Sequence, residues 1–148
     1  MEQRQASRLI LPDGDGRVLL LRHRRRDGST FWAAPGGGVQ SGETFEQAAL
    51  REAAEELGAT GRPVKFLWEG ASEFMHVAGK VQQREQFFLL DGAAPAPTPD
   101  LQATWRAEGI LEARWWTLAE IESAQDVFPE NLAAEVNRTL GIGARRGA

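Results

Sequence analysis

The sequence predicts an α+β fold in which a curved, mixed β-sheet is held between helices. Two observations indicate this fold. Segments rich in branched and aromatic side chains recur between Gly, Pro and Asp turns, as strands do, and a smaller number of segments have helix-forming composition. The 148 residues suffice for one domain with a sizeable core, so residues 1–148 are expected to form a single domain.

Strands are expected near the N-terminus. The segments "ASRLIL" (6–11) and "RVLLLRHRR" (17–25) are rich in Leu, Ile and Val, and "PDGDG" between them has the Asp-Gly chemistry of a tight turn. These features predict that the two segments pair as a hairpin. The short apolar segment "FWAAP" (31–35) follows and is ended by its proline.

A helix is predicted from Thr44 to Gly58. Thr44 and Gln47 fit a capping box, Gly58 fits a C-terminal stop, and the residues between them are mostly Ala, Glu, Gln and Leu. From Pro63 to Asp91 the composition changes to that of two long antiparallel strands joined near "AGK".

The C-terminal third predicts a loop, a strand and two helices. "GAAPAPTPD" (92–100) is expected to be an exposed loop, and "EARWWTL" (112–118) a last strand. "LAEIESA" (118–124) and "ENLAAEVNRTLG" (130–141) are the predicted helices, and residues 142–148 are expected to form a flexible tail.

Composition narrows the possible functions. The chain has no cysteine, which excludes disulfides, thiol catalysis and cysteine-bound zinc. Its net charge of −4 argues against non-specific binding to nucleic acid, and no apolar run is long enough for a membrane span. The N-terminus lacks the apolar core of a signal peptide, so the protein is expected to be cytoplasmic, without nucleic-acid or membrane partners.

The predicted helix carries a cluster of glutamates, Glu52, Glu55 and Glu56. At about 100° per residue they lie within an arc of roughly 100°. The apolar residues expected to form the buried stripe on the opposite side are Leu50, Ala53, Ala54 and Leu57. Like charges at this spacing repel, and hard cations such as Mg²⁺ or Mn²⁺ reverse that repulsion. A solvated acidic face is the simpler alternative for a glutamate pair taken alone.

The glycines before the helix complete a longer pattern. Residues 37–59 have the spacing G-x5-E-x7-R-E-U-x-E-E-x-G-U, the Nudix box. The residues at its fixed positions are Gly37, Glu43, Arg51, Glu52, Glu55, Glu56 and Gly58. The positions that usually carry bulky aliphatic residues hold Ala53 and Ala59, which affects packing and leaves the chemical residues complete. The chain therefore resembles the Nudix hydrolase family, and its MutT-like branch in particular.

The resemblance implies an α/β/α sandwich and a hydrolase that cleaves diphosphate linkages in nucleoside diphosphate derivatives, with Mg²⁺ or Mn²⁺ as cofactor. The residues that match the family's metal ligands are the Gly36 carbonyl, Glu52, Glu55 and Glu56. Glu52 is the first candidate to orient or deprotonate the attacking water, with Glu56 as the central ligand, and the two roles are exchangeable. The residues that match the family's structural support of the site are Gly37, Glu43 and Arg51.

Further candidates lie outside the box and come from the same resemblance. An additional catalytic carboxylate is expected from Glu108, before the last strand, or from Glu85, on a strand; an ordinary surface glutamate is the alternative at either position. Arg22 matches a phosphate-contacting arginine. Trp32 and its neighbour Phe31 are candidates to stack on a base, although core packing is expected for at least one of them.

Asn131 loosely resembles a base-recognising asparagine, and its alternative is a polar residue at a helix N-terminus. The marks of the ADP-ribose, dinucleoside polyphosphate and NADH subfamilies are missing, which favours a nucleoside triphosphate or related nucleotide as the small-molecule substrate. Hydrolysis of ADP-ribose, a nucleotide sugar or a dinucleoside polyphosphate is the alternative, followed by a non-catalytic nucleotide-sensing module. Family members are often dimers, so a homodimer is also allowed.

Overall fold

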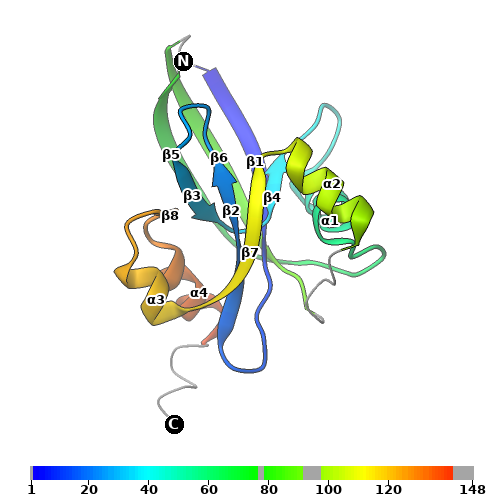
Figure 1. The fold of residues 1–148 in the computed structure, drawn as a ribbon, viewed down its shortest axis with the longest axis vertical. Helices are drawn as coiled ribbons and strands as arrows, with labels where there is room; N and C mark the ends of the chain where they lie inside the picture. The colour runs from blue at the N-terminus through cyan, green and yellow to red at the C-terminus, as the bar shows by residue number, and fades with distance from the viewer. Residues whose placement is uncertain (1, 77–78, 92–97, 142–148) are drawn as a thin grey trace.

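Two four-stranded sheets lie between two groups of helices (Figure 1). The computed structural model describes residues 2–76, 79–91 and 98–141. Helices α1 (Phe45–Leu57) and α2 (Pro99–Ala107) lie on one side, and α3 (Leu118–Ser123) and α4 (Leu132–Leu140) on the other. The predicted α/β/α sandwich is therefore confirmed, with two sheets in place of one.

The two sheets are both mixed. Sheet A has the strand order β4 (Gly36–Gly38), β1 (Glu2–Ile10), β6 (Gly79–Leu89) and β5 (Lys65–His76). Sheet B has the order β7 (Ile110–Thr117), β2 (Arg17–Arg24), β3 (Thr30–Ala33) and β8 (Val127–Phe128). The pairs β1–β6 and β3–β8 are parallel, and the other pairs are antiparallel. The long antiparallel strands predicted between Pro63 and Asp91 are β5 and β6.

The predicted N-terminal hairpin is wrong. Strands β1 and β2 belong to different sheets, and in the described part of the chain they share an isolated bridge between Pro12 and Val18. The physical reason is that β4 and β6 occupy both edges of β1, so no edge is left for β2. The Asp-Gly segment still turns the chain, with a hydrogen bond of 2.8 Å from Asp13 N to Arg17 O.

Alternate residues of β1 and β6 face opposite sides of sheet A. Their parallel register sets Gln5 beside Arg84 on one side and Ala6 beside Glu85 on the other. The first side, which carries Leu9, packs against α1, and we call it the outer face. The second side packs against sheet B, and we call it the inner face.

Helix α1 begins and ends as predicted. Thr44 and Gln47 form the capping box, and Gly58 closes the helix in the left-handed region with a φ of 67°. The local sequence is enough to fix both ends, because each cap is made by residues within one turn of the helix.

The buried face of α1 differs from the prediction. Glu52 and Glu56 are only 7% and 2% exposed, whereas Leu50, expected in the buried stripe, is 38% exposed. The buried apolar residues of the helix are Ala48, Ala49, Ala53 and Leu57. The helix lies against both β1 and β4, so the side that carries the glutamates is covered by the glycine turn instead of by water.

Helix α2 forms where a loop was expected. Thr98 accepts a hydrogen bond from Leu101 N, and Pro99 and Asp100 occupy the first turn, which is a favourable helix start. The loop prediction is therefore wrong at its C-terminal end, and residues 92–97 lie outside the described residues.

The remaining predicted elements agree with the structure. Strand β7 and helices α3 and α4 occupy the predicted segments, and the predicted tail at 142–148 lies outside the described residues. In the described ranges, no helix is both long and apolar enough to cross a membrane.

Candidate active site

The turn that leads into α1 needs glycine at two positions. Gly36 has a φ of +143°, and a Cβ at this residue would collide with the carbonyl oxygen of Ser7 on β1. A Cβ on Gly37 would lie 2.7 Å from Oε1 of Glu52. Glycine therefore allows the turn to lie against β1 on one side and against the glutamates of α1 on the other.

Two of the three predicted carboxylates lie beneath this turn. Oε1 of Glu56 accepts a hydrogen bond of 2.9 Å from Gly36 N, and Oε1 of Glu52 accepts one of 2.8 Å from Arg51 Nη1. Glu55 lies at the rim, with its side chain 51% exposed. The fold thus brings together Gly36, Glu52 and Glu56 and leaves Glu55 near solvent.

Burial raises the pKa of both buried carboxylates. Loss of water is the largest cause at Glu56 and raises its pKa to about 8; the charge of Glu52 adds to the rise, and the Gly36 N–H opposes it. Burial also raises the pKa of Glu52, although the Arg51 guanidinium opposes this shift. Buried carboxylates in this condition favour either a proton or a nearby cation.

Arg51 ties the loop before α1 to the helix. Its Nε and Nη2 donate to the two oxygens of Glu43 at 2.8 and 3.0 Å, and Nη2 also donates to Gly38 O at 2.9 Å. Its Nη1 contacts Glu52 and, at 3.2 Å, Glu55. This paired geometry is what a structural support of the turn requires, and hydrogen bonds from Arg51 lower the pKa of Glu43.

The two candidates for an additional carboxylate have different surroundings. Glu108 follows the last turn of α2, and its carboxyl lies close enough to Glu56 to raise the pKa of that residue. Trp105 anchors α2 in this place because its Nε1 donates a 2.7 Å hydrogen bond to Glu56 O. Glu85 instead forms a 3.0 Å ion pair with Arg8. The structure therefore groups Glu108 with the box carboxylates and Glu85 with an arginine.

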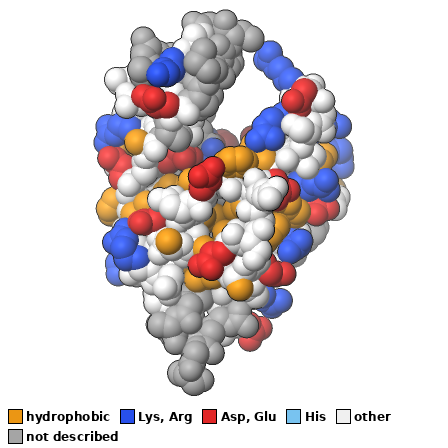
Figure 2. Space-filling model, turned by 90° about the vertical axis from the view of Figure 1, so that its left-hand side faces the viewer, with side chains coloured by type: hydrophobic (Ala, Val, Ile, Leu, Met, Phe, Trp, Pro, Cys, Tyr) orange, Lys and Arg blue, Asp and Glu red, His pale blue; other side chains and the backbone are white. Residues whose placement is uncertain are grey.

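A cleft of about 570 Å³ opens between the inner face of sheet A and the β3–β8 side of sheet B. The polar and aromatic residues among the described ones that line it are Arg8, Glu73, Gln83, Glu85, Phe87, Arg25, Phe31 and Phe128. Viewed from the side that carries β5 and β3, hydrophobic side chains gather in a band across the middle of the surface, with Lys, Arg, Asp and Glu side chains around them (Figure 2). The cleft neighbours the glycine turn without including it: Ala34 lines the cleft, and Nη1 of Arg8, another lining residue, lies 3.4 Å from Gly36 O.

The far end of the cleft is aromatic. The rings of Phe31 and Phe128 meet edge to face at 6.2 Å, and the guanidinium of Arg25 lies 4.5 Å above the Phe31 ring. His23 stacks on Phe31 at 5.1 Å, and burial, followed by the charge of Arg8, lowers its pKa to about 4. Flat apolar rings beside a guanidinium suit a planar base.

Trp32 does not line this cleft, which corrects the expectation that it stacks on a base. It is 6% exposed and packs edge to face against Trp116 in the core. The reason is the alternation of β3, which directs Phe31 and Trp32 to opposite faces. Of the two aromatic candidates, the cleft is lined by Phe31.

Arg22 and Asn131 lie apart from the carboxylates. Arg22 donates a 3.2 Å hydrogen bond to Thr30 Oγ1 and approaches Glu112 to 3.9 Å; it does not line the cleft. Asn131 is exposed at the N-terminus of α4 and makes no side-chain cap bond. It follows Pro129, a residue of the cleft wall, by two positions, so it lies near the cleft edge.

The carboxylates suit a hard divalent cation in their chemistry. Glu52 and Glu56 offer buried oxygens with raised pKa values, and Gly36 adds a carbonyl oxygen. The described residues contain no three His, Cys, Asp or Glu side chains already gathered into a ligand group. The hydrogen bonds from Arg51 and Gly36 engage Oε1 of each carboxylate, and a carboxylate has a second oxygen with which it can bind an ion.

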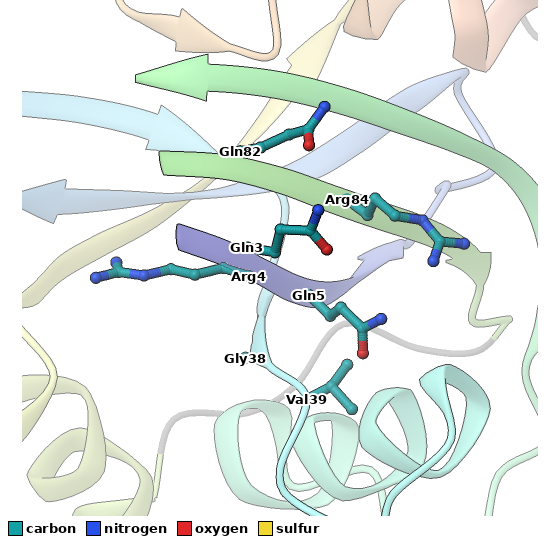
Figure 3. Close-up of a pocket in the computed structure, with 7 residues that line it drawn as sticks. All are labelled: Gln3, Arg4, Gln5, Gly38, Val39, Gln82 and Arg84. Atoms are coloured by element: carbon teal, nitrogen blue, oxygen red, sulfur yellow. The ribbon is translucent and has the colours of Figure 1, made fainter. Parts of the chain in front are cut away.

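A second hollow, of about 540 Å³, lies on the outer face of sheet A. In Figure 3, Gln3, Gln5 and Arg84 extend to one side of their strands and Arg4 extends to the other. Its lining contains no carboxylate, and Arg84 is paired with Glu69 at 2.6 Å. Of the two hollows, the first is therefore the one that a hydrogen bond of a lining residue links to the turn at Gly36 in the described part of the chain.

Comparison with known proteins decides the family. The model of the NUDIX domain matches residues 2–136. The chain belongs to the NUDIX domain family. It is accordingly a Nudix hydrolase, as the box at residues 37–59 predicts.

Individual relatives agree with this assignment. The Nudix chain is 31% identical over 130 residues to an RNA pyrophosphohydrolase of Sphingopyxis alaskensis, with 80% of each protein covered. It is 44% identical over 105 residues to an oxidized purine nucleoside triphosphate hydrolase of Danio rerio, covering 66% of this chain and 62% of that protein. The crystal structure of a MutT Nudix hydrolase from Burkholderia pseudomallei shares the fold, with a TM-score of 0.64 at 22% identity, covering 95% of this chain and 99% of the other.

The cleft residues of this Nudix protein that were not predicted from sequence include Arg8, Arg25 and Phe128. Arg8 could have been found, since it is a single arginine between Ala6 and Ile10 on the inner face of a strand. Arg25 lies in a basic run just after β2, which by itself indicates solvated charges. Phe128 could not have been found, because only the pairing of β3 with β8 brings its segment to the cleft.

Proposed function

We propose that the protein is a metal-dependent pyrophosphohydrolase that cleaves a diphosphate linkage in a nucleoside triphosphate or a closely related nucleotide. The observation that carries this proposal is the connection between two features. Buried Glu52 and Glu56 adjoin the Gly36 turn, and Arg8, whose Nη1 lies 3.4 Å from Gly36 O, lines a cleft that also contains Phe31 and Phe128. A nucleotide has the matching shape, with anionic phosphates at one end and a planar base at the other.

The residues that would hold Mg²⁺ or Mn²⁺ are Glu52, Glu56, Glu55 at the rim and the Gly36 carbonyl. The chemistry that such an ion supplies when bound is neutralisation of diphosphate oxygens, which otherwise repel a nucleophile. Glu52 orients the attacking water or takes its proton, and Glu56 is the central ligand. Glu108 adds negative charge beside them from α2, and we assign to it the additional carboxylate role.

The reaction is a hydrolysis at phosphorus. The water oxygen forms a new bond to phosphorus, the anhydride P–O bond breaks, and the proton of the water passes to a carboxylate. The base end of the substrate lies at the aromatic end of the cleft, against Phe31, Phe128 and the Arg25 guanidinium that covers the Phe31 ring, with Asn131 nearby in sequence. Glu43 and Arg51 support the turn without contacting the substrate.

The names of the relatives favour nucleotides with an intact phosphate chain. An oxidized purine nucleoside triphosphate hydrolase supports a nucleoside triphosphate, and an RNA pyrophosphohydrolase supports a phosphorylated RNA end as the second candidate. ADP-ribose, nucleotide sugars and dinucleoside polyphosphates are the remaining alternatives within the same reaction class.

The test is a substrate panel with Mg²⁺ and Mn²⁺ in parallel. It contains the nucleoside triphosphates, an oxidised purine triphosphate, a 5′-triphosphorylated oligoribonucleotide, ADP-ribose and a nucleotide sugar, and it measures released phosphate and pyrophosphate. We expect turnover of a triphosphate, its loss in Glu56→Gln, and a raised KM with nearly constant kcat in Phe31→Ala. Absence of turnover on the whole panel would refute the proposal, and exclusive turnover of the oligoribonucleotide would replace the substrate.

A further inference from the structure

Arg8 is a charged residue in an otherwise apolar position. It lies on the inner face of β1 between Ala6 and Ile10, and its side chain is 20% exposed. Removing a guanidinium from water is unfavourable unless a carboxylate compensates for it. Glu85 supplies that carboxylate, at 3.0 Å from Nε, and its own side chain is 13% exposed.

The ion pair with Glu85 uses only the Nε edge of the Arg8 guanidinium. Nε donates to Glu85, and Nη1 makes two long contacts of 3.4 Å, to Ala34 O and Gly36 O. Among the described residues, Nη2 of Arg8 makes no hydrogen bond. A guanidinium has five N–H donors in a fixed plane, so Glu85 holds the group in place while donors remain for a ligand.

The remaining donors lie between the two ends of the proposed site. Gly36 donates its N–H to Glu56 and accepts from Arg8 through its carbonyl, so a single residue links the guanidinium to the buried carboxylate of Glu56. Arg8 also lines the same cleft as Phe31 and Phe128. A nucleotide whose reacting phosphate is at the carboxylates and whose base is at the rings has its phosphate chain beside Arg8.

We infer that Arg8 binds a non-bridging phosphate oxygen of the nucleotide and that Glu85 is the positioning residue that holds its guanidinium in the cleft. This inference rests on the proposed function. It assigns to Arg8 the phosphate contact expected of Arg22, and it makes Glu85 a residue that positions Arg8 instead of the additional catalytic carboxylate. Arg25 does not fill this place, because its guanidinium lies over the Phe31 ring.

The inference is tested by calorimetric titration with a nucleoside and with its non-hydrolysable triphosphate analogue, in Mg²⁺. Arg8→Ala should weaken binding of the analogue by at least about tenfold and leave nucleoside binding within about twofold. Arg8→Lys should recover part of the loss, since it restores one charge without the planar fork. In kinetics the loss should fall mainly on KM.

The double variant Arg8→Ala/Glu85→Ala separates binding by Arg8 from repulsion by an unpaired Glu85. The same weak binding in the double variant supports the inference, and recovery to the wild-type affinity would overturn it. Arg138→Ala is the matched control, because it removes an arginine paired with Glu135 on α4, away from the cleft. An equal loss of analogue binding in Arg138→Ala would show that the effect comes from the net charge of the protein, and it would overturn the inference.

Arg22→Ala tests the competing assignment. A loss of analogue binding at Arg22 with none at Arg8 would overturn the inference in favour of the arginine indicated by sequence. If the wild type hydrolyses a nucleotide and Arg8→Ala binds the analogue as tightly as the wild type, the role of Arg8 is refuted and the proposed function stands. A wild-type protein that neither binds nor hydrolyses any nucleotide would refute the proposed function as well.

Discussion

Glu56 shows at the scale of one residue why the box glutamates cannot be interpreted as a solvated acidic face. Its carboxylate is 2% exposed and is hydrogen-bonded to a backbone N–H, which leaves its charge with little compensation. Such a residue lowers the stability of the folded chain when it is ionised. A buried carboxylate at position 56 is explained if it binds a cation, which would compensate its charge.

The pH dependence of stability should reveal Glu56. Between the ordinary carboxyl pKa of 4.5 and the folded value of about 8, the folded protein binds the Glu56 proton that the unfolded chain has released. Stability of the metal-free protein should therefore decrease as pH rises through this window, by up to about 1.4 kcal/mol per unit. Thermal melts in EDTA across this range would measure the slope, with Glu56→Gln as comparison.

Glu56→Gln removes the titrating group, so its melting temperature should fall less steeply with pH than that of the wild type. Equal slopes in the two proteins would show that Glu56 is ionised in the folded state throughout the window.

Gly37 should tolerate no side chain. A Cβ would lie 2.7 Å from Glu52 Oε1, so Gly37→Ala should displace this carboxylate and reduce kcat/KM on the order of 10²-fold. Gly14→Ala is the control, because no atom lies within 4 Å of a Cβ there. Steady-state kinetics and a melt of each variant check this, and full activity in Gly37→Ala would place Glu52 outside the reaction.

Among the secondary-structure elements, local signals were sufficient for α1 and insufficient for β1 and β2. The caps of α1 are contacts between neighbours in sequence, so Thr44, Gln47 and Gly58 specify its ends. The partners of β1 are β4 and β6, which come much later in the chain, and the Asp-Gly turn contains no information about them. Helix α2 had a local start signal at Thr98 and Pro99 that the neighbouring prolines obscured.

Helix α2 should act by positioning Glu108. Trp105→Phe removes the hydrogen bond to Glu56 O and should lower kcat by about tenfold with little change in KM. In the Trp105→Phe background, Glu108→Gln should reduce kcat less than it does in the wild type, because the Glu108 carboxyl is already displaced from the box carboxylates. Kinetics of the two single variants and the double variant form the cycle, and strictly additive losses would contradict this coupling.

On the scale of the whole molecule, the site forms where two sheets and one helix meet. The carboxylates come from α1, the turn from β4, the arginine from β1 and the aromatic rings from β3 and β8. A ligand that bridges these elements binds only the folded chain and therefore stabilises it.

Mg²⁺ or Mn²⁺ should raise the melting temperature of the wild type and not that of Glu56→Gln. The shift should be larger at pH 8 than at pH 6, because an ion must displace the proton from a carboxyl with a pKa of about 8. Differential scanning calorimetry with each ion measures both effects. A shift of equal size in the two proteins would remove Glu56 from the ion site.

The sequence by itself determined the family, the position of α1 and the identities of the clustered glutamates, because a box of fixed spacing and two helix caps are local features. Tertiary structure alone decided which of Glu85 and Glu108 lies beside the box carboxylates, which aromatic residue reaches the cleft, and that Arg8 lies beside the turn. These outcomes depend on which strands become neighbours and on which face of each strand is covered. Contacts between segments that are distant in sequence determine which strands pair and which faces are covered. The residues within one segment do not specify those contacts.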